Sequence, residues 1–121
     1  MTKIAIVTGG TRGIGASISK KLKSSNFKVI ANYTSNDDAA ESFSKENNIE
    51  VFKWDVGNYD ECQSSINKIY EDNKNIDILV NNAGTNRPDH FTKIKKEDMD
   101  YVVDLNIKAA FHVAQMATNV M

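Results

Sequence analysis

The sequence has one cysteine, one proline and six glycines among 121 residues, and its formal net charge is −1. A single cysteine, Cys62, excludes an internal disulfide and a metal site built from several cysteines. The near-zero charge, with both signs mixed along the chain, gives no electrostatic footprint for nucleic acid or an anionic membrane. No apolar stretch approaches the length that crosses a bilayer, and no charged-then-apolar leader is seen. We therefore expect a cytoplasmic protein without nucleic-acid or membrane partners.

The few residues that bind metals or react as nucleophiles are isolated in this sequence. His90 and His112 have no further ligands at metal-binding spacing, so we assign both a structural or surface role. We expect Cys62 to be a reduced, half-buried helix residue. With 40% hydrophobic residues, a chain of this length can bury one core, which predicts a single domain over residues 1–121.

The most informative segment is glycine-rich: Thr8–Gly15 (TGGTRGIG) directly follows the apolar run Ile4–Val7. A buried strand that turns through glycines into a helix presents free backbone N–H groups and the positive end of a helix dipole to an anion. Gly9 allows a tight exit from the strand, Gly13 allows close approach of a pyrophosphate, and Gly15 allows close helix–sheet packing. The spacing differs from the commoner G-x-G-x-x-G, and a glycine turn without ligand is the alternative. The flanking strand and helix favour dinucleotide binding.

Strand-like and helix-like segments alternate along the chain. Apolar runs predict strands at Ile4–Thr8, Lys28–Tyr33, Ile49–Trp54 and Ile76–Val80. Three- and four-residue spacing predicts helices with the apolar stripes Ile14, Ile18, Leu22; Ala39, Ala40, Phe43; and Tyr59, Cys62, Ile66, Ile69, Tyr70. A last helix runs from about Glu97 to the end, broken near Asn106. This order predicts an α/β fold: a Rossmann-type doubly wound parallel sheet, truncated after about four strands and a long helix, with ligands bound beyond the carboxyl ends of the strands.

The end of the second predicted strand indicates the cofactor. An NAD site places a carboxylate about 20 residues beyond the glycine loop, where it holds the ribose 2′-hydroxyl. Here Asn32, Tyr33 and Thr34 occupy that place, and the first carboxylate is Asp37. Hydroxyl and amide donors suit a 2′-phosphate, and Arg12 can fork onto phosphate oxygens. We predict NADP(H), the alternative for Arg12 being an exposed loop residue that faces solvent.

Several motifs together resemble the amino-terminal half of the short-chain dehydrogenase/reductase family, and the resemblance covers Met1 to Met121. They are Thr8-Gly9-x3-Gly13-x-Gly15, Asp55, Asn81-Asn82-Ala83-Gly84 and Asn106. Within the family, Val29–Asn32 and Trp54–Tyr59 are most similar to bacterial acetoacetyl-CoA reductases, relatives of the 3-oxoacyl-carrier-protein reductases. Beyond Gly84, residues 85–88 and 104–106 also resemble sugar and polyol dehydrogenases.

The resemblance assigns roles to individual residues. Asp55 would accept a hydrogen bond from the adenine amino group beside the Val56 backbone; a carboxylate near a helix dipole is the alternative. Asn106 would perturb its helix and hold a water for proton relay, or it is an ordinary polar helix residue. The cofactor-binding set is Thr8, Gly9, Thr11, Arg12, Gly13, Ile14, Gly15, Asn32, Tyr33, Thr34, Asp55, Val56, Asn82, Ala83 and Gly84.

The family's catalytic Ser and Tyr-x3-Lys pair have no match in the sequence. A phenol with a pKa near 10 exchanges protons near neutrality only if a cation stabilises its phenolate. The one such string, Tyr70 to Lys74, precedes the fourth strand, and Tyr70 continues a helical apolar stripe, so we reject it. We expect the pair to follow Met121 in a chain about twice as long, and residues 1–121 to be inactive alone.

The resemblance therefore implies NADPH-dependent reduction of a 3-oxoacyl thioester, acetoacetyl-CoA, to the 3-hydroxyacyl thioester by a homo-oligomer, a tetramer. A 3-oxoacyl-carrier-protein reductase or a sugar or polyol dehydrogenase is the alternative within the family. Outside it, the alternatives are a non-catalytic nucleotide-binding module and an interaction fragment whose last helix packs against a partner.

Overall fold

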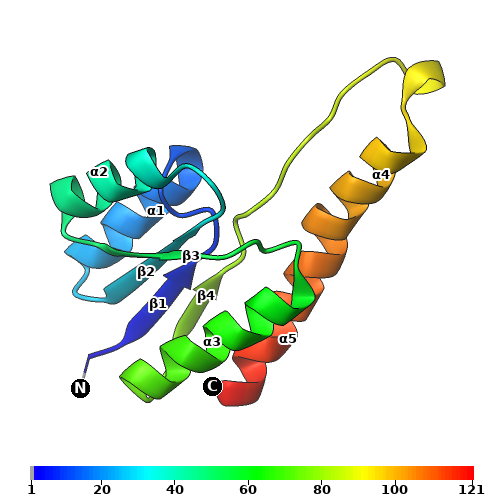
Figure 1. Ribbon diagram of the computed structural model, residues 1–121. Coiled ribbons are helices and arrows are strands. Elements are labelled where there is room, and N and C mark those ends of the chain that lie inside the picture. The colour runs from blue at the N-terminus through cyan, green and yellow to red at the C-terminus, as the bar shows by residue number, and fades with distance from the viewer. Residues whose placement is uncertain (1) are drawn as a thin grey trace.

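The computed structural model describes residues 2–121 and contains a parallel four-stranded sheet with helices on both faces (Figure 1). The strands are β1 (Ile4–Val7), β2 (Lys28–Tyr33), β3 (Glu50–Lys53) and β4 (Ile78–Val80). Their spatial order is β3-β2-β1-β4, so the chain builds outward from β1 and then crosses back to its other side. The predicted Rossmann-type α/β fold is confirmed, with the order reversing at β1, where such sheets bind ligands.

The helices follow the predicted order, and the last one is interrupted. They are α1 (Gly13–Ser24), α2 (Asp37–Asn47), α3 (Tyr59–Asn73), α4 (Lys96–Val103) and α5 (Ala110–Val120), with a short 3₁₀ turn at Phe91–Lys93. A π-helical segment, Asp104–Ala109, joins α4 to α5, which confirms the predicted break near Asn106. Asn36 and Asn58 cap α2 and α3 by accepting from the backbone N–H three residues on, at 3.1 and 3.0 Å.

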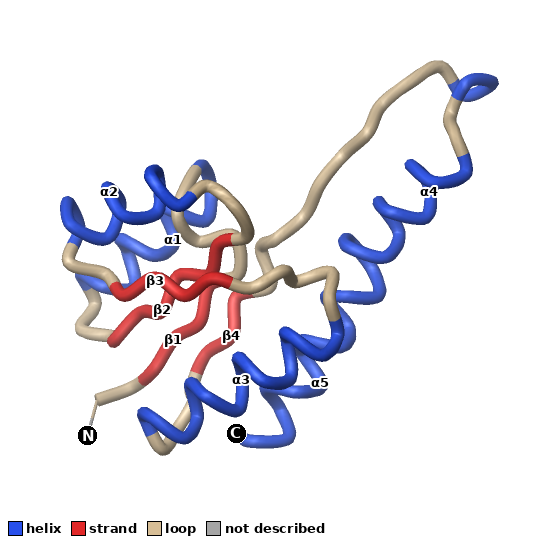
Figure 2. Tube along the Cα trace, viewed as in Figure 1, coloured by secondary structure: helices blue, strands red, loops and turns tan. Residues whose placement is uncertain are grey.

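Helices α1 and α2 cover one face of the sheet and α3 and α5 cover the other (Figure 2). An apolar cluster lies on each of these faces. The larger packs α3 and α5 against the sheet around Trp54, Ile66 and Val113, and the smaller packs α1 and α2 around Val29 and Phe43. Burying both faces explains why β1 reads as a continuous apolar run, with every residue buried. The rigid sheet therefore fixes the loops at its carboxyl edge.

Four residues assigned to apolar stripes, Ile14, Ala39, Tyr59 and Tyr70, lie on the surface instead. Ile14 is 76% exposed, because the first turn of α1 adjoins the glycine loop, and only Ile18 and Leu22 pack against the smaller cluster. Tyr59 and Tyr70 are 51% and 36% exposed, since they lie at the margins of the stripe on α3. Amphipathic spacing identifies the helices but overstates the width of their buried faces.

The segment after β4 leaves the sheet and leads to α4, which extends away from the other elements (Figure 1). Within residues 2–121, no helix has both the length and the apolar character needed to span a membrane.

Candidate functional site

The glycine loop follows β1 at the carboxyl edge of the sheet, where the strand order reverses. Gly9 and Gly13 have φ values of +60° and +55°, a region that residues with a Cβ rarely adopt. A Cβ at position 13 would meet no atom within 4 Å, so the backbone faces open space there. This open space leaves room for the pyrophosphate expected at Gly13, and that contact stays a prediction.

Gly15 is required by the loop itself rather than by the sheet. A Cβ at this position would overlap the carbonyl oxygen of Gly9 and lie 2.6 Å from Nδ2 of Asn82. The predicted close contact exists, but its partner is corrected: the first turn of α1 packs on the glycine loop and on the end of β4.

Sequence reasoning missed Gly10 and Ser19, which make a second close contact. A Cβ at position 10 would lie 2.7 Å from the Val7 carbonyl oxygen and 2.9 Å from Oγ of Ser19. The buried Ser19 hydroxyl donates to the Gly10 carbonyl at 2.9 Å. Ser19 lies one helical turn after Gly15, so a small polar residue at that spacing was the available signal.

Thr8 is fully buried and holds two strand ends together. Its Oγ1 accepts from the backbone N–H groups of Asn82 and Ala83, both at 3.0 Å, and its own N–H donates to the Val80 carbonyl at 3.1 Å. With 0% exposure its side chain cannot touch a cofactor. The expected ligand contact of Thr8 is therefore corrected to a structural role beneath the site.

Asn32 is also corrected. Its side chain is 1% exposed: Oδ1 accepts from the Gly9 N–H at 3.0 Å, and Nδ2 donates to the Trp54 carbonyl at 3.0 Å. Because the amide is used on both sides, Asn32 braces the glycine loop against the end of β3 and does not offer a donor to a 2′-phosphate. Tyr33 and the exposed Thr34 follow it at the surface.

The Asn-Asn-Ala-Gly segment connects β4 to the rest of the site. Nδ2 of Asn82 donates to the carbonyls of Thr8 and Gly9, both at 3.1 Å, as expected of short amides that satisfy a neighbouring strand. Nδ2 of Asn81 donates to the Ala110 carbonyl at 2.8 Å and so joins β4 to the start of α5. Ala83 and Gly84 continue this edge without bulk.

Asn106 pairs with the backbone of the loop that follows Gly84. Its Oδ1 accepts from the Thr85 N–H and its Nδ2 donates to the Thr85 carbonyl, both at 2.8 Å. Asn106 lies inside the π-helical segment, and π-turns are frequent at functional sites. The amide thus holds the loop beside the helix, and its further role in proton relay stays a prediction.

Asp55 stabilises the turn that follows β3. Its Oδ1 accepts from the Gly57 N–H at 2.9 Å, while the residue is exposed at the same edge of the sheet. The Val56 side chain is buried, so only its backbone can contribute to a ligand site. The adenine contact stays a prediction, and the exposed carboxylate is placed compatibly with it.

The start of α1 has features that suit an anion. No acidic residue lies in its first turn, whereas α2, α3 and α4 each carry two there. Arg12 at the N-cap makes no capping bond, so first-turn N–H groups remain available. Within residues 2–121, Arg12 forms no ion pair, and its exposed guanidinium is free to bind. Thr11, Arg12, Gly13 and Ile14 therefore form the edge at which we predict that an anion binds.

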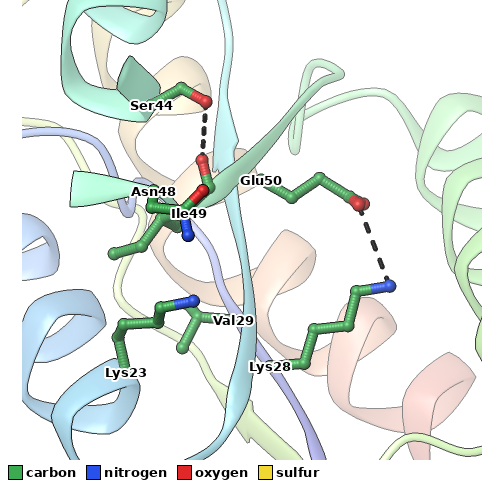
Figure 3. Close-up of a pocket in the computed structure, with 7 residues that line it drawn as sticks. All are labelled: Lys23, Lys28, Val29, Ser44, Asn48, Ile49 and Glu50. Atoms are coloured by element: carbon green, nitrogen blue, oxygen red, sulfur yellow. Dashed lines mark hydrogen bonds and ion pairs between the residues drawn. The ribbon is translucent and has the colours of Figure 1, made fainter. Parts of the chain in front are cut away.

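A hollow of about 300 Å³ lies at the opposite end of the strands (Figure 3). It is lined by Lys23, Lys28, Val29, Ser44, Asn48, Ile49 and Glu50. Two of its polar side chains already have partners within the hollow: Lys28 contacts Glu50 at 3.9 Å, and the Ser44 hydroxyl donates to the Ile49 carbonyl at 2.7 Å (Figure 3). The carboxyl ends of α1 and α2, which lie here, do not favour an anion. We assign no ligand to it.

Cys62 is more buried than expected, at 1% exposure rather than half-buried. It lies in the larger apolar cluster, and its thiol donates to the Val56 carbonyl at 3.2 Å. Burial raises the pKa of the Cys62 thiol to about 11. No group of three metal-ligating side chains occurs in the part of the chain that the structure describes.

The raised thiol pKa predicts slow alkylation of Cys62. With a pKa about 11, far less thiolate is present at pH 8 than in the unfolded chain, where the pKa is about 8.5. We expect iodoacetamide to modify the folded protein on the order of a hundred times more slowly than the urea-unfolded protein. Mass spectrometry at timed quench points measures both rates, and equal rates would show that the thiol is accessible.

Comparisons with known proteins agree with this geometry. Residues 3–121 match the family model described as short chain dehydrogenase. The chain is 45% identical over 113 residues to an acetoacetyl-CoA reductase of Paracoccus denitrificans, covering 93% of this chain and 47% of that protein. It is 35% identical over 123 residues to a 3-oxoacyl-[acyl-carrier-protein] reductase of Staphylococcus aureus, covering 98% and 50%.

A solved short-chain dehydrogenase/reductase from Serratia marcescens superposes with a TM-score of 0.93 at 31% identity, covering 98% of this chain and 51% of that one. The chain thus spans about half the length of the relatives it matches. The glycine loop, the buried Thr8 and the Asn-Asn-Ala-Gly segment lie at one edge of the parallel sheet, and the family model matches residues 3–121. This chain belongs to the short-chain dehydrogenase/reductase family.

Proposed function

We propose that this chain forms the cofactor-binding half of an NADPH-dependent reductase that converts a 3-oxoacyl thioester, acetoacetyl-CoA, to its 3-hydroxyacyl form. The observation that carries the proposal is the unpaired Arg12 at the N-cap of α1, beside a glycine backbone open to solvent and a first turn without carboxylates. The named relatives, which include acetoacetyl-CoA and 3-oxoacyl-carrier-protein reductases, support the substrate class.

The residues present fit a phosphorylated dinucleotide. The open backbone at Gly13 leaves room for a pyrophosphate, and first-turn N–H groups of α1 would donate to it. Arg12 and Thr34 would hold a 2′-phosphate. Asp55 and the Val56 backbone would bind the adenine, and Ala83 and Gly84 would lie against the ribose near the nicotinamide. When bound, the cofactor supplies a hydride.

The chain's own residues would orient that chemistry. The hydrogen-bond network of Thr8, Asn32 and Asn82 fixes the glycine loop against both neighbouring strands, so little reorganisation accompanies binding. Asn106 fixes the Thr85 loop at the edge where the carbonyl substrate would lie, and would hold the proton-relay water there. The reaction would also need a proton donor, a Tyr with its Lys, and a Ser, as the family resemblance implies.

We further propose that the enzyme works in the cytoplasm as a homo-oligomer. Large apolar side chains on the last helical region support the oligomer, because Ile107 and Phe111 lie four residues apart and are each 64% exposed. Sedimentation of the full-length protein tests the oligomer, and a monomer at micromolar concentration would contradict it.

Arg12→Ala tests the proposed cofactor. Hydrogen bonds to charged groups contribute about 1.5–3 kcal/mol, so losing the guanidinium should weaken NADPH binding roughly 10- to 100-fold. NADH lacks the 2′-phosphate, and its affinity should change less than about threefold. Titration calorimetry of the purified protein with both dinucleotides measures the two dissociation constants.

Lys20→Ala is the matched control, because Lys20 is an exposed cation on the same helix. It should leave both affinities unchanged, and Arg12→Lys should recover part of the NADPH affinity. Equal losses of NADPH and NADH on Arg12→Ala would show that Arg12 does not contact the 2′-phosphate. Failure of the full-length protein to oxidise NADPH with acetoacetyl-CoA would overturn the proposed reaction.

A further inference from the structure

Three polar side chains form a cluster where β2 and β3 end. Tyr33 and Lys53 are the last residues of these strands and are paired in register, and Asp37 is the first residue of α2. The Tyr33 hydroxyl donates to Oδ1 of Asp37 at 3.1 Å, and Nζ of Lys53 lies 3.1 Å from the same oxygen. Oδ2 of Asp37 also accepts from Lys53, at 3.3 Å, so both carboxylate oxygens are engaged.

Lys53 is the main partner of this carboxylate. Its hydrogen bond, followed by that of Tyr33, holds the pKa of Asp37 below the usual value, so Asp37 is ionised at neutral pH. The side chains of Lys53 and Asp37 are about half exposed, at 51% and 63%. The Lys53–Asp37 pair therefore contributes little to the free energy of folding. Its effect on a charged group bound nearby is the more informative property to measure.

The cluster adjoins the proposed cofactor site. The N–H groups of Gly9 and Gly10 both donate to Asn32, the residue before Tyr33, at 3.0 and 2.9 Å. Between Tyr33 and Asp37 the chain exposes Thr34, proposed above as a partner of the 2′-phosphate. Asp37 is thus the first carboxylate beyond β2, and it follows by three residues the place where an acidic side chain selects the unphosphorylated ribose.

We infer that Lys53 is a positioning residue for cofactor choice: it holds and neutralises Asp37, which would otherwise oppose the 2′-phosphate of NADPH and favour NADH. This inference rests on the proposed function. Lys53 acts through Asp37 and need not touch the cofactor. A free carboxylate here could turn toward the ribose and accept from its 2′-hydroxyl, whereas the engaged carboxylate is held toward β3.

The experiment compares dissociation constants of NADPH and NADH for the purified protein and its variants. We expect Lys53→Met to raise the ratio of the NADPH to the NADH dissociation constant about three- to tenfold. The reason is that the negative charge of Asp37 is then no longer neutralised by a neighbouring cation. Lys53→Arg should keep the ratio of the unmodified protein, and the double variant Lys53→Met with Asp37→Asn should restore it within about twofold. In 0.5 M salt the effect of Lys53→Met should shrink, because the groups are exposed to screening.

Lys68→Met is the matched control, because Lys68 pairs with Asp72 at 3.0 Å on α3, on the other face of the sheet. It should not change the ratio. An unchanged ratio in Lys53→Met would overturn the inference, and so would a change that persists when Asp37→Asn is added. In either case, NADPH binding by the unmodified protein would leave the proposed function standing. If the unmodified protein binds neither dinucleotide, both are overturned. The ratio is independent of a uniform loss of affinity, so a purely structural role of Lys53 would not move it.

Discussion

Gly15→Ala is expected to abolish dinucleotide binding and to lower the free energy of unfolding by about 3 kcal/mol. The added Cβ would overlap the Gly9 carbonyl and crowd the Asn82 amide, which are hydrogen-bonded to each other. Neither neighbour can yield cheaply, because Gly9 is tied to Asn32 and Asn82 is tied to the backbone of Thr8. Urea denaturation followed by circular dichroism, with NADPH titration on the same samples, measures both effects.

Gly13→Ala is the control that separates backbone strain from steric overlap. Gly13 has φ of +55° but no atom within 4 Å of the added methyl, so only the conformational penalty of about 1 kcal/mol applies. The folded protein should survive this change with weaker NADPH binding. If both variants lose equal stability, the contact of α1 with the glycine loop is not the reason for Gly15.

The elements of the fold were predictable because apolar periodicity is a property of the local sequence. The strand Lys28–Tyr33 was predicted to its exact bounds, since a strand buried on both faces leaves a continuous apolar run between polar ends. Asn36 and Asn58 mark helix starts through their side-chain oxygens, which need only the next three residues. The break at Asn106 was also local, as asparagine is a modest helix former.

The sequence did not distinguish the site residues that can contact a ligand from those that support the glycine loop. Asn32 and Arg12 both carry donors suited to a phosphate, and only the folded structure shows that the amide is buried while the guanidinium is exposed. The partners of Asn32 lie 23 residues before it, at Gly9, and 22 residues after it, at Trp54. Such long-range pairing leaves no signal in the residue itself, so motif residues that touch the ligand and those that support them look alike in sequence.

Thr8→Val should destabilise the protein by about 1–3 kcal/mol while leaving the side-chain volume nearly unchanged. The hydroxyl accepts from the N–H groups of Asn82 and Ala83, and a methyl in its place leaves the Ala83 N–H without an acceptor. The Asn82 N–H keeps its second bond, to the Val80 carbonyl at 3.1 Å. Because the same network positions the glycine loop, NADPH affinity should fall as well. Thermal unfolding without NADPH measures the loss of stability. The same measurement with NADPH shows how much the variant is still stabilised by the cofactor.

Thr8→Ser distinguishes the hydroxyl from the methyl group. Serine keeps the acceptor for both N–H groups and removes one buried carbon, which should lower stability by about 1 kcal/mol. A loss in Thr8→Ser as large as that in Thr8→Val would mean that packing, and not hydrogen bonding, gives Thr8 its role. The expected order instead places the hydrogen bonds first, because this buried oxygen joins the end of β1 to the segment after β4, together with the Asn82 amide. A cofactor edge shared by two strands requires them to keep one register.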